Sequence, residues 1–169
     1  YQLIFGLALT ALFFVATAAQ AQGPLTPGSP DAPDAVVLHY DPADGNTWAT
    51  GNAVTMTSFQ LESNTDAFII DNINPDFGVN DPFKVISPAK LFTLQTGGIQ
   101  EVQLGKVLPL GLDEAALLAD LVIDGSLMPS GKYTDASGAG PYLNVVPEPS
   151  SALLSLVGLL GLVSLRRKS

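Results

Sequence analysis

The stretch "AVTMTSFQLE", residues 53–62, decides the fold, because apolar and polar side chains alternate in it with the two-residue period of a β-strand. The period is broken once. Met56 has one parity, whereas Phe59 and Leu61 have the other. The apolar face therefore changes sides near residues 57–58, which predicts a β-bulge there or a strand that is buried on both sides.

Further short apolar runs surround this strand and are separated by turn signals such as Asp44-Gly45 and Gly97-Gly98. Many short strands with turns between them are typical of two packed sheets. We therefore expect an all-β domain over residues 35–145, an antiparallel β-sandwich or jelly roll. The other predicted strands cover residues 35–40, 47–50, 67–70, 83–86, 91–95, 99–105, 121–127 and 142–146.

One segment has a helical pattern instead, "GLDEAALLADL", residues 111–121. Asp113 is a good N-cap residue, and Glu114 suits the positive end of the helix dipole. Leu117 and Leu121 are four residues apart and share one face. We expect one short helix that covers an end of the sheets.

The charge distribution excludes several classes of protein. The formal net charge is −9, and residues 31–146 contain four lysines and no arginine. An acidic domain without a basic patch is repelled by phosphate backbones, so we expect no nucleic-acid partner. The chain has no cysteine and a single histidine, His39, which excludes thiol catalysis and Cys/His zinc sites. We expect no enzymatic activity.

The N-terminal segment "YQLIFGLALTALFFVATAAQAQG" has the pattern of an export signal. A short apolar run is followed by Ala19 and Ala21 with one residue between them, the small-x-small pattern that signal peptidase cleaves. We expect a signal peptide over residues 1–21. A membrane anchor is the alternative, which the short run disfavours. The proline-rich residues 22–34 are expected to form a linker without helix or central strand.

The loop over residues 71–83 is rich in side-chain oxygens of the kind that Ca²⁺ prefers. Its spacing does not fit the EF-hand template, and the same residue types form ordinary loops. The sequence leaves both open, an ordinary loop or a calcium site, with no other cofactor expected. The "DPADGN" turn, residues 41–46, offers a weaker calcium candidate. The candidate ligands are Asp71, Asn72, Asn74 and Asp76, with Asn80 and Asp81 nearby.

Four aromatic residues, Trp48, Tyr40, Tyr133 and Tyr142, could form a platform for sugar rings. Core and rim positions explain them equally well. His39 lies in an apolar run and is expected to be a half-buried structural histidine.

The segment over residues 150–165 is uncharged and mostly apolar, and as a helix it would span about 24 Å. That length approaches the hydrocarbon core of a bilayer, so we expect a transmembrane helix. The basic residues Arg166, Arg167 and Lys168 follow directly and predict a cytoplasmic tip, with the acidic domain outside.

The order Val146-Pro147-Glu148-Pro149, apolar helix and basic tip resembles the PEP-CTERM protein-sorting signal. The resemblance implies recognition of the proline motif by exosortase, an integral-membrane cysteine transpeptidase, in a Gram-negative host that often makes extracellular polysaccharide. It also implies that residues 146–169 hold the precursor in the membrane until they are cut. A plain anchor that is never cut is the alternative.

Three middle segments resemble the uncharacterised domain that precedes this signal in planctomycete-type surface proteins: "VLHYDPADGN", "TSFQLES" and "LGKVLPLGLDEAALLADLVIDGSL". That resemblance implies an all-β fold and no catalytic residues. We therefore expect a cell-surface or extracellular-matrix protein with a structural or adhesive role that touches polysaccharide. The alternative is a carbohydrate-binding module, with or without calcium.

Overall fold

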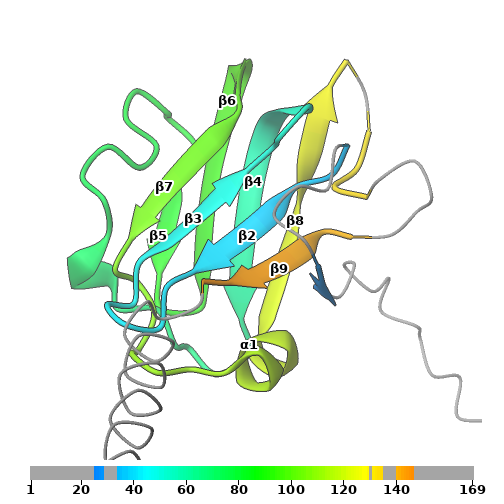
Figure 1. Cartoon of the computed structure of the whole chain (residues 1–169). Helices are drawn as coiled ribbons and strands as arrows, with labels where there is room; N and C mark the ends of the chain where they lie inside the picture. The colour runs from blue at the N-terminus through cyan, green and yellow to red at the C-terminus, as the bar shows by residue number, and fades with distance from the viewer. Residues whose placement is uncertain (1–24, 29–33, 130, 135–139, 147–169) are drawn as a thin grey trace, which may run out of the picture.

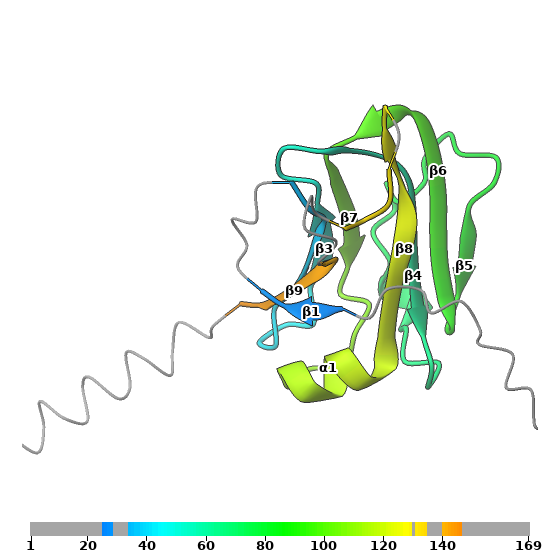
Figure 2. The same ribbon diagram turned by 90° about the vertical axis from the view of Figure 1, so that its right-hand side faces the viewer.

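The chain folds into two β-sheets that pack face to face, with a short helix across one end (Figure 1). Figure 2 shows the two layers edge-on, with α1 below them. The predicted β-rich domain with one short helix is confirmed for the described part of the chain. The computed structural model describes residues 25–28, 34–129, 131–134 and 140–146.

Several predicted features lie outside the described residues: the signal peptide over residues 1–21 with its Ala19 and Ala21, and the segment over residues 147–169. Among the described residues, no helix is both long and apolar enough to cross a membrane.

The four-stranded sheet is antiparallel throughout and has the order β5-β6-β4-β8. Strand β4 is the predicted strand, and its pairing with both neighbours shifts register between Met56 and Ser58. The predicted bulge is therefore confirmed, and Met56, Phe59 and Leu61 all lie in the core despite their different parities. The strands are β4 (Thr55–Ser63), β5 (Val85–Ser87), β6 (Lys90–Ile99) and β8 (Leu121–Met128).

The five-stranded sheet has the order β1-β9-β2-β3-β7, and it corrects the prediction of a purely antiparallel fold. Strand β9 lies between β1 and β2 and is parallel to both. The chain reaches β9 from β8 in the other sheet, and such a crossover allows parallel pairing that a tight hairpin forbids. The strands are β1 (Thr26–Pro27), β2 (Val37–Tyr40), β3 (Thr47–Thr50), β7 (Glu101–Gly105) and β9 (Tyr142–Val145).

The proline-rich linker contains an edge strand that the sequence did not predict. Thr26 and Gly28 donate their amides to the carbonyls of Pro141 and Leu143, at 2.9 and 3.3 Å. Pro27 lies between them and has no amide to donate, which an edge position tolerates.

The helix α1 (Glu114–Asp120) is confirmed with its cap. The Asp113 carboxylate accepts a hydrogen bond from the Ala116 amide at 2.8 Å, and Leu117 is buried in the core. The predicted turn over residues 41–46 is also confirmed, since the Asp41 amide donates to the Asn46 carbonyl across the β2–β3 connection.

The strand predicted over residues 67–70 is wrong. Phe68 is buried, but Ile69 and Ile70 are exposed, and a 3-10 turn, η1 (Ile70–Asn72), follows. The backbone amides of Phe68 and Ile69 bond to the loop carbonyls of Pro88 and Val107, so the segment joins loops and forms no sheet ladder.

The break predicted at residues 97–98 is also wrong, since β6 continues through both glycines to Ile99. Gly98 has a φ of 81°, which glycine adopts without strain, and Ile99 pairs with Met56 where β4 bulges. The flexible pair thus lets β6 follow the bulge.

Candidate functional site

The outer face of the five-stranded sheet carries a row of polar and aromatic side chains. Leu38 and Tyr40 point into the core, so His39 between them points to the outer face. Its cross-strand neighbours are Trp48 on β3 and Asn144 on β9. The strand register therefore places three ring or amide side chains side by side.

His39 holds Trp48 by stacking. The two ring centroids are 4.9 Å apart and the planes differ by 5°. The Asn144 amide nitrogen lies 3.1 Å from His39 Nδ1, and Thr50 Oγ1 lies 2.9 Å from Nε2. Asn144 donates to Nδ1, so Nε2 carries the proton and donates to Thr50. Both ring nitrogens are occupied, and the imidazole acts as a fixed support for the indole.

Burial lowers the pKa of His39 below 6.5, and the negative charge of Glu101 only partly offsets that effect. The ring is therefore neutral at pH 7, which agrees with the single ring proton that its two hydrogen bonds require. This arrangement matches the predicted structural histidine.

The predicted aromatic platform is reduced to half of its members. The Tyr40 hydroxyl donates to the Pro109 carbonyl at 2.5 Å, and the Tyr133 hydroxyl donates to the Ser58 carbonyl. Both rings are fully buried, and burial raises the pKa of Tyr133 far above its usual value. Trp48 and Tyr142 remain half-buried on the outer face, where β3 and β9 place them.

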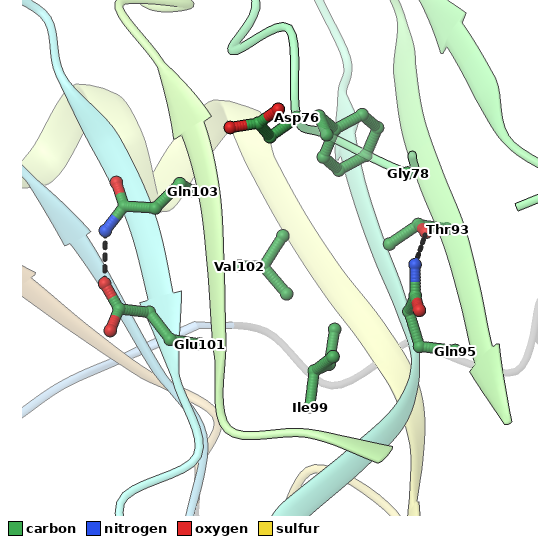
Figure 3. Close-up of a pocket in the computed structure, with 9 residues that line it drawn as sticks. Asp76, Gly78, Thr93, Gln95, Ile99, Glu101, Val102 and Gln103 are labelled. Atoms are coloured by element: carbon green, nitrogen blue, oxygen red, sulfur yellow. Dashed lines mark hydrogen bonds between the residues drawn. The ribbon is translucent and has the colours of Figure 1, made fainter. Parts of the chain in front are cut away.

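A pocket of about 250 Å³ opens between β6 and β7, where the edges of the two sheets meet, and no sequence pattern predicts it (Figure 3). Its apolar part comes from Phe77, Ile99 and Val102. Asp76 comes from the loop after η1, Glu101 and Gln103 from β7, and Gln95 from β6. Gln103 donates to Glu101, and Gln95 donates to Thr93 at 3.5 Å. These residues come from three separated segments in no recognisable motif, so spacing could not have revealed the pocket.

The pocket and the outer face meet on β7. Gln103 pairs with Trp48, and Glu101 pairs with Thr50. The Glu101 and Gln103 side chains therefore lie on the outer face beside the indole, whereas Val102 between them faces the hollow on the other side of β7 (Figure 3). Such a surface can exchange hydrogen bonds with hydroxyl groups while a ring face stacks on the indole.

Three of the four predicted calcium ligands lie at the surface, and the fourth is bonded within its own loop. Asp71, Asn72 and Asp76 are exposed, and Asn74 accepts a hydrogen bond from the Asp76 amide at 2.9 Å. Within the described ranges, no group of three or more His, Cys, Asp or Glu side chains could hold a metal ion. The weaker candidate, Asp44, pairs with Lys106 at 3.1 Å and accepts the Asn46 amide at 2.9 Å. Calcium binding stays a prediction.

Asp81 fastens this loop to the sheet. It accepts hydrogen bonds from the Phe83 amide and the Thr93 hydroxyl, both at 2.8 Å, and from the Leu94 amide. Burial acts to raise the pKa of Asp81, but these donors outweigh it and hold the pKa below the usual value. The carboxylate therefore has a structural role.

The predicted sorting motif begins where the described domain ends. The Val146 amide donates to the Tyr40 carbonyl at 2.8 Å, which continues the β9–β2 ladder to that residue. The other motif and tip residues, Pro147, Glu148, Pro149, Arg166, Arg167 and Lys168, lie outside the described residues.

None of the curated proteins and none of the solved structures matches this chain. One family model does. It is described as the PEP-CTERM protein-sorting motif, and it covers residues 145–168. The match begins at the last residue of β9, so the chain is a β-domain protein that carries a PEP-CTERM protein-sorting motif directly after its final described strand.

Proposed function

We propose that this chain is an exported, non-catalytic protein that exosortase processes at the membrane and delivers to the cell surface or extracellular matrix. The supporting observation is the junction at Val146, where the β domain passes without a spacer into the sorting motif. In this proposal signal peptidase removes residues 1–21, and residues 150–165 anchor the precursor in the inner membrane of a Gram-negative host.

The role proposed for the delivered domain is structural or adhesive, as in the planctomycete-type surface proteins that the middle of the chain resembles. Its two sheets share one continuous core, and its acidic surface favours solubility outside the cell. Both properties suit a module that is displayed rather than one that performs chemistry.

The intact mass of the protein recovered from its native host tests this proposal. We expect a chain that begins near Gln22 and ends within residues 147–149, with any added mass identifying an attachment. A chain that still ends at Ser169 would mean an uncut anchor and would contradict exosortase processing.

A second candidate function, carbohydrate binding, is favoured by the outer face of the five-stranded sheet. Trp48 stacks against His39, and Gln103 is its partner on β7. A fixed indole beside amide and carboxylate groups is suited to a sugar ring, which offers an apolar face and peripheral hydroxyls. We propose extracellular polysaccharide as the ligand class.

Titration of the folded protein with polysaccharide purified from the host tests this second function. Trp48→Ala should abolish binding, while Phe83→Ala removes an exposed aromatic residue elsewhere and should leave binding unchanged. Equal loss in both variants, or no binding by the unmodified protein, would contradict a saccharide site at Trp48.

A further inference from the structure

We propose that the end of the β domain that carries Ile69, Ile70 and Leu110 lies against the bilayer surface in the uncut precursor. These three residues are named here the apolar rim. The inference rests on the proposed function, because it requires residues 150–165 to be inserted in the membrane.

The first step is the length of the tether. Val146 is fixed to β2 by its bond to the Tyr40 carbonyl, and the apolar run begins at Ser150. Three residues, 147–149, lie between them, so the Cα atoms of Val146 and Ser150 are at most about 14 Å apart. The domain edge at Val146 must therefore stay close to the lipid headgroups.

The second step is that the loop containing Leu110 lies at the same edge of the domain as Val146. The Tyr40 hydroxyl donates to the Pro109 carbonyl, and the Gly111 amide donates to the Pro42 carbonyl at 2.9 Å. These bonds place the loop that contains Leu110 beside the end of β2. In Figure 1 the ends of β2, β7 and β9 and the start of β8 at α1 lie toward the same, lower side.

The third step is the apolar surface at this edge. Leu110 is 65% exposed, Ile69 40% and Ile70 36%. The Ile69 amide donates to the Val107 carbonyl at 2.8 Å, so both isoleucines adjoin the Leu110 loop. A groove of about 370 Å³ with a mainly apolar lining, including Leu112 and Ala116, continues the rim toward α1. Large exposed aliphatic side chains at the edge nearest the bilayer fit its interfacial region.

The charges at the rim specify the lipid. Asp41, Asp44, Asp113 and Glu114 lie on the two adjoining loops and the start of α1, and Lys106 is engaged with Asp44. A predominantly acidic edge is repelled by anionic headgroups, so the rim suits a zwitterionic surface. The partner is therefore a neutral phospholipid surface.

Depth-dependent quenching on the full chain tests the orientation. The chain has no cysteine, so Leu110→Cys introduces a unique site for an environment-sensitive fluorophore. The matched control is Met128→Cys, which labels an exposed residue at the far end of β8, opposite α1. Each labelled protein is reconstituted in phosphatidylcholine vesicles that contain lipids with a quencher near the headgroup.

We expect the probe at position 110 to lose most of its fluorescence and the probe at position 128 to lose little. Equal quenching at the two positions in vesicles that float with the protein would overturn the inference and leave the anchor intact. If the protein did not float with the vesicles, both the proposed membrane anchor and this inference would be contradicted. Quenching at position 110 that needs added exosortase would assign the rim to the enzyme and overturn the lipid contact.

Discussion

His39 lies flat against Trp48, with the two ring planes only 5° from parallel, although nine positions separate these residues in the chain. The β2–β3 register makes them direct partners, and hydrogen bonds from Asn144 to Nδ1 and from Nε2 to Thr50 fix the imidazole. The orientation of the indole therefore depends on groups from three neighbouring strands.

Replacing His39 by alanine should release the indole. The loss of stacking and of the hydrogen bonds at both ring nitrogens should cost about 1–3 kcal/mol of unfolding free energy. Trp48 is the chain's single tryptophan, so its emission reports the change directly in urea unfolding. Thr50→Val keeps the stack and removes one bond, so its effect should be smaller. An unchanged emission spectrum in His39→Ala would show that the stack does not order the indole.

Protonation of His39 should make the free energy of unfolding depend on pH. Its pKa is lowered in the folded state, so between that lowered pKa and 6.5 the unfolded chain binds the extra proton. The stabilisation is complete above about pH 6.5 and is lost as the pH falls through this window. Urea unfolding from pH 7.5 to 5 should show a steeper decline for the unmodified protein than for His39→Gln. Parallel curves would contradict the lowered pKa.

Removal of the Asp81 carboxylate should loosen the loop over residues 71–83. Asp81→Ala leaves the Leu94 amide and Thr93 hydroxyl without their acceptor, and we expect a loss of about 2–3 kcal/mol. Thr93→Val removes one of the three bonds and is the milder control. Thermal unfolding that ranks the two variants equally would mean that the backbone bonds to Asp81 contribute little.

The predicted calcium site has a direct test in melting experiments. If Asp71, Asn72, Asn74 and Asp76 bind Ca²⁺, the melting temperature should rise with the calcium concentration and fall with a chelator. Asp76→Asn should weaken the response, whereas Asp113→Asn, at the cap of α1, should not. A melting temperature that is the same in millimolar calcium and in chelator would reject the site.

Local patterns predicted the local structure well. The parity change between Met56 and Phe59 indicated the bulge, and the residues "LDEAALL" indicated the helix and its Asp113 cap. Both features depend on neighbours within a few positions along the chain. The strand predicted over residues 67–70 was wrong because the structure of that segment does not depend on near neighbours. Its backbone amides bond to distant loops, which no local pattern reveals.

The candidate site could be predicted from the sequence only in part. His39 and Trp48 were each singled out, but their contact needs the β2–β3 register, and the pocket needs Asp76 beside β7. The parallel placement of β9 depends on where the other strands of its sheet leave room for it, between β1 and β2, and sequence spacing carries no such information. The sorting motif was found because its recognition is linear and does not depend on folding.

Strand β9 is the piece that completes the five-stranded sheet. It is among the last segments of the domain to be synthesised, yet it lies inside its sheet, between β1 and β2. Until residues 142–145 have been made, β2 has β3 alone as a neighbour, and β1 lacks the strand with which it pairs. The five-stranded sheet is thus completed only by the strand that adjoins the sorting motif, so its last hydrogen bonds form at the end of the chain that exosortase is proposed to cut.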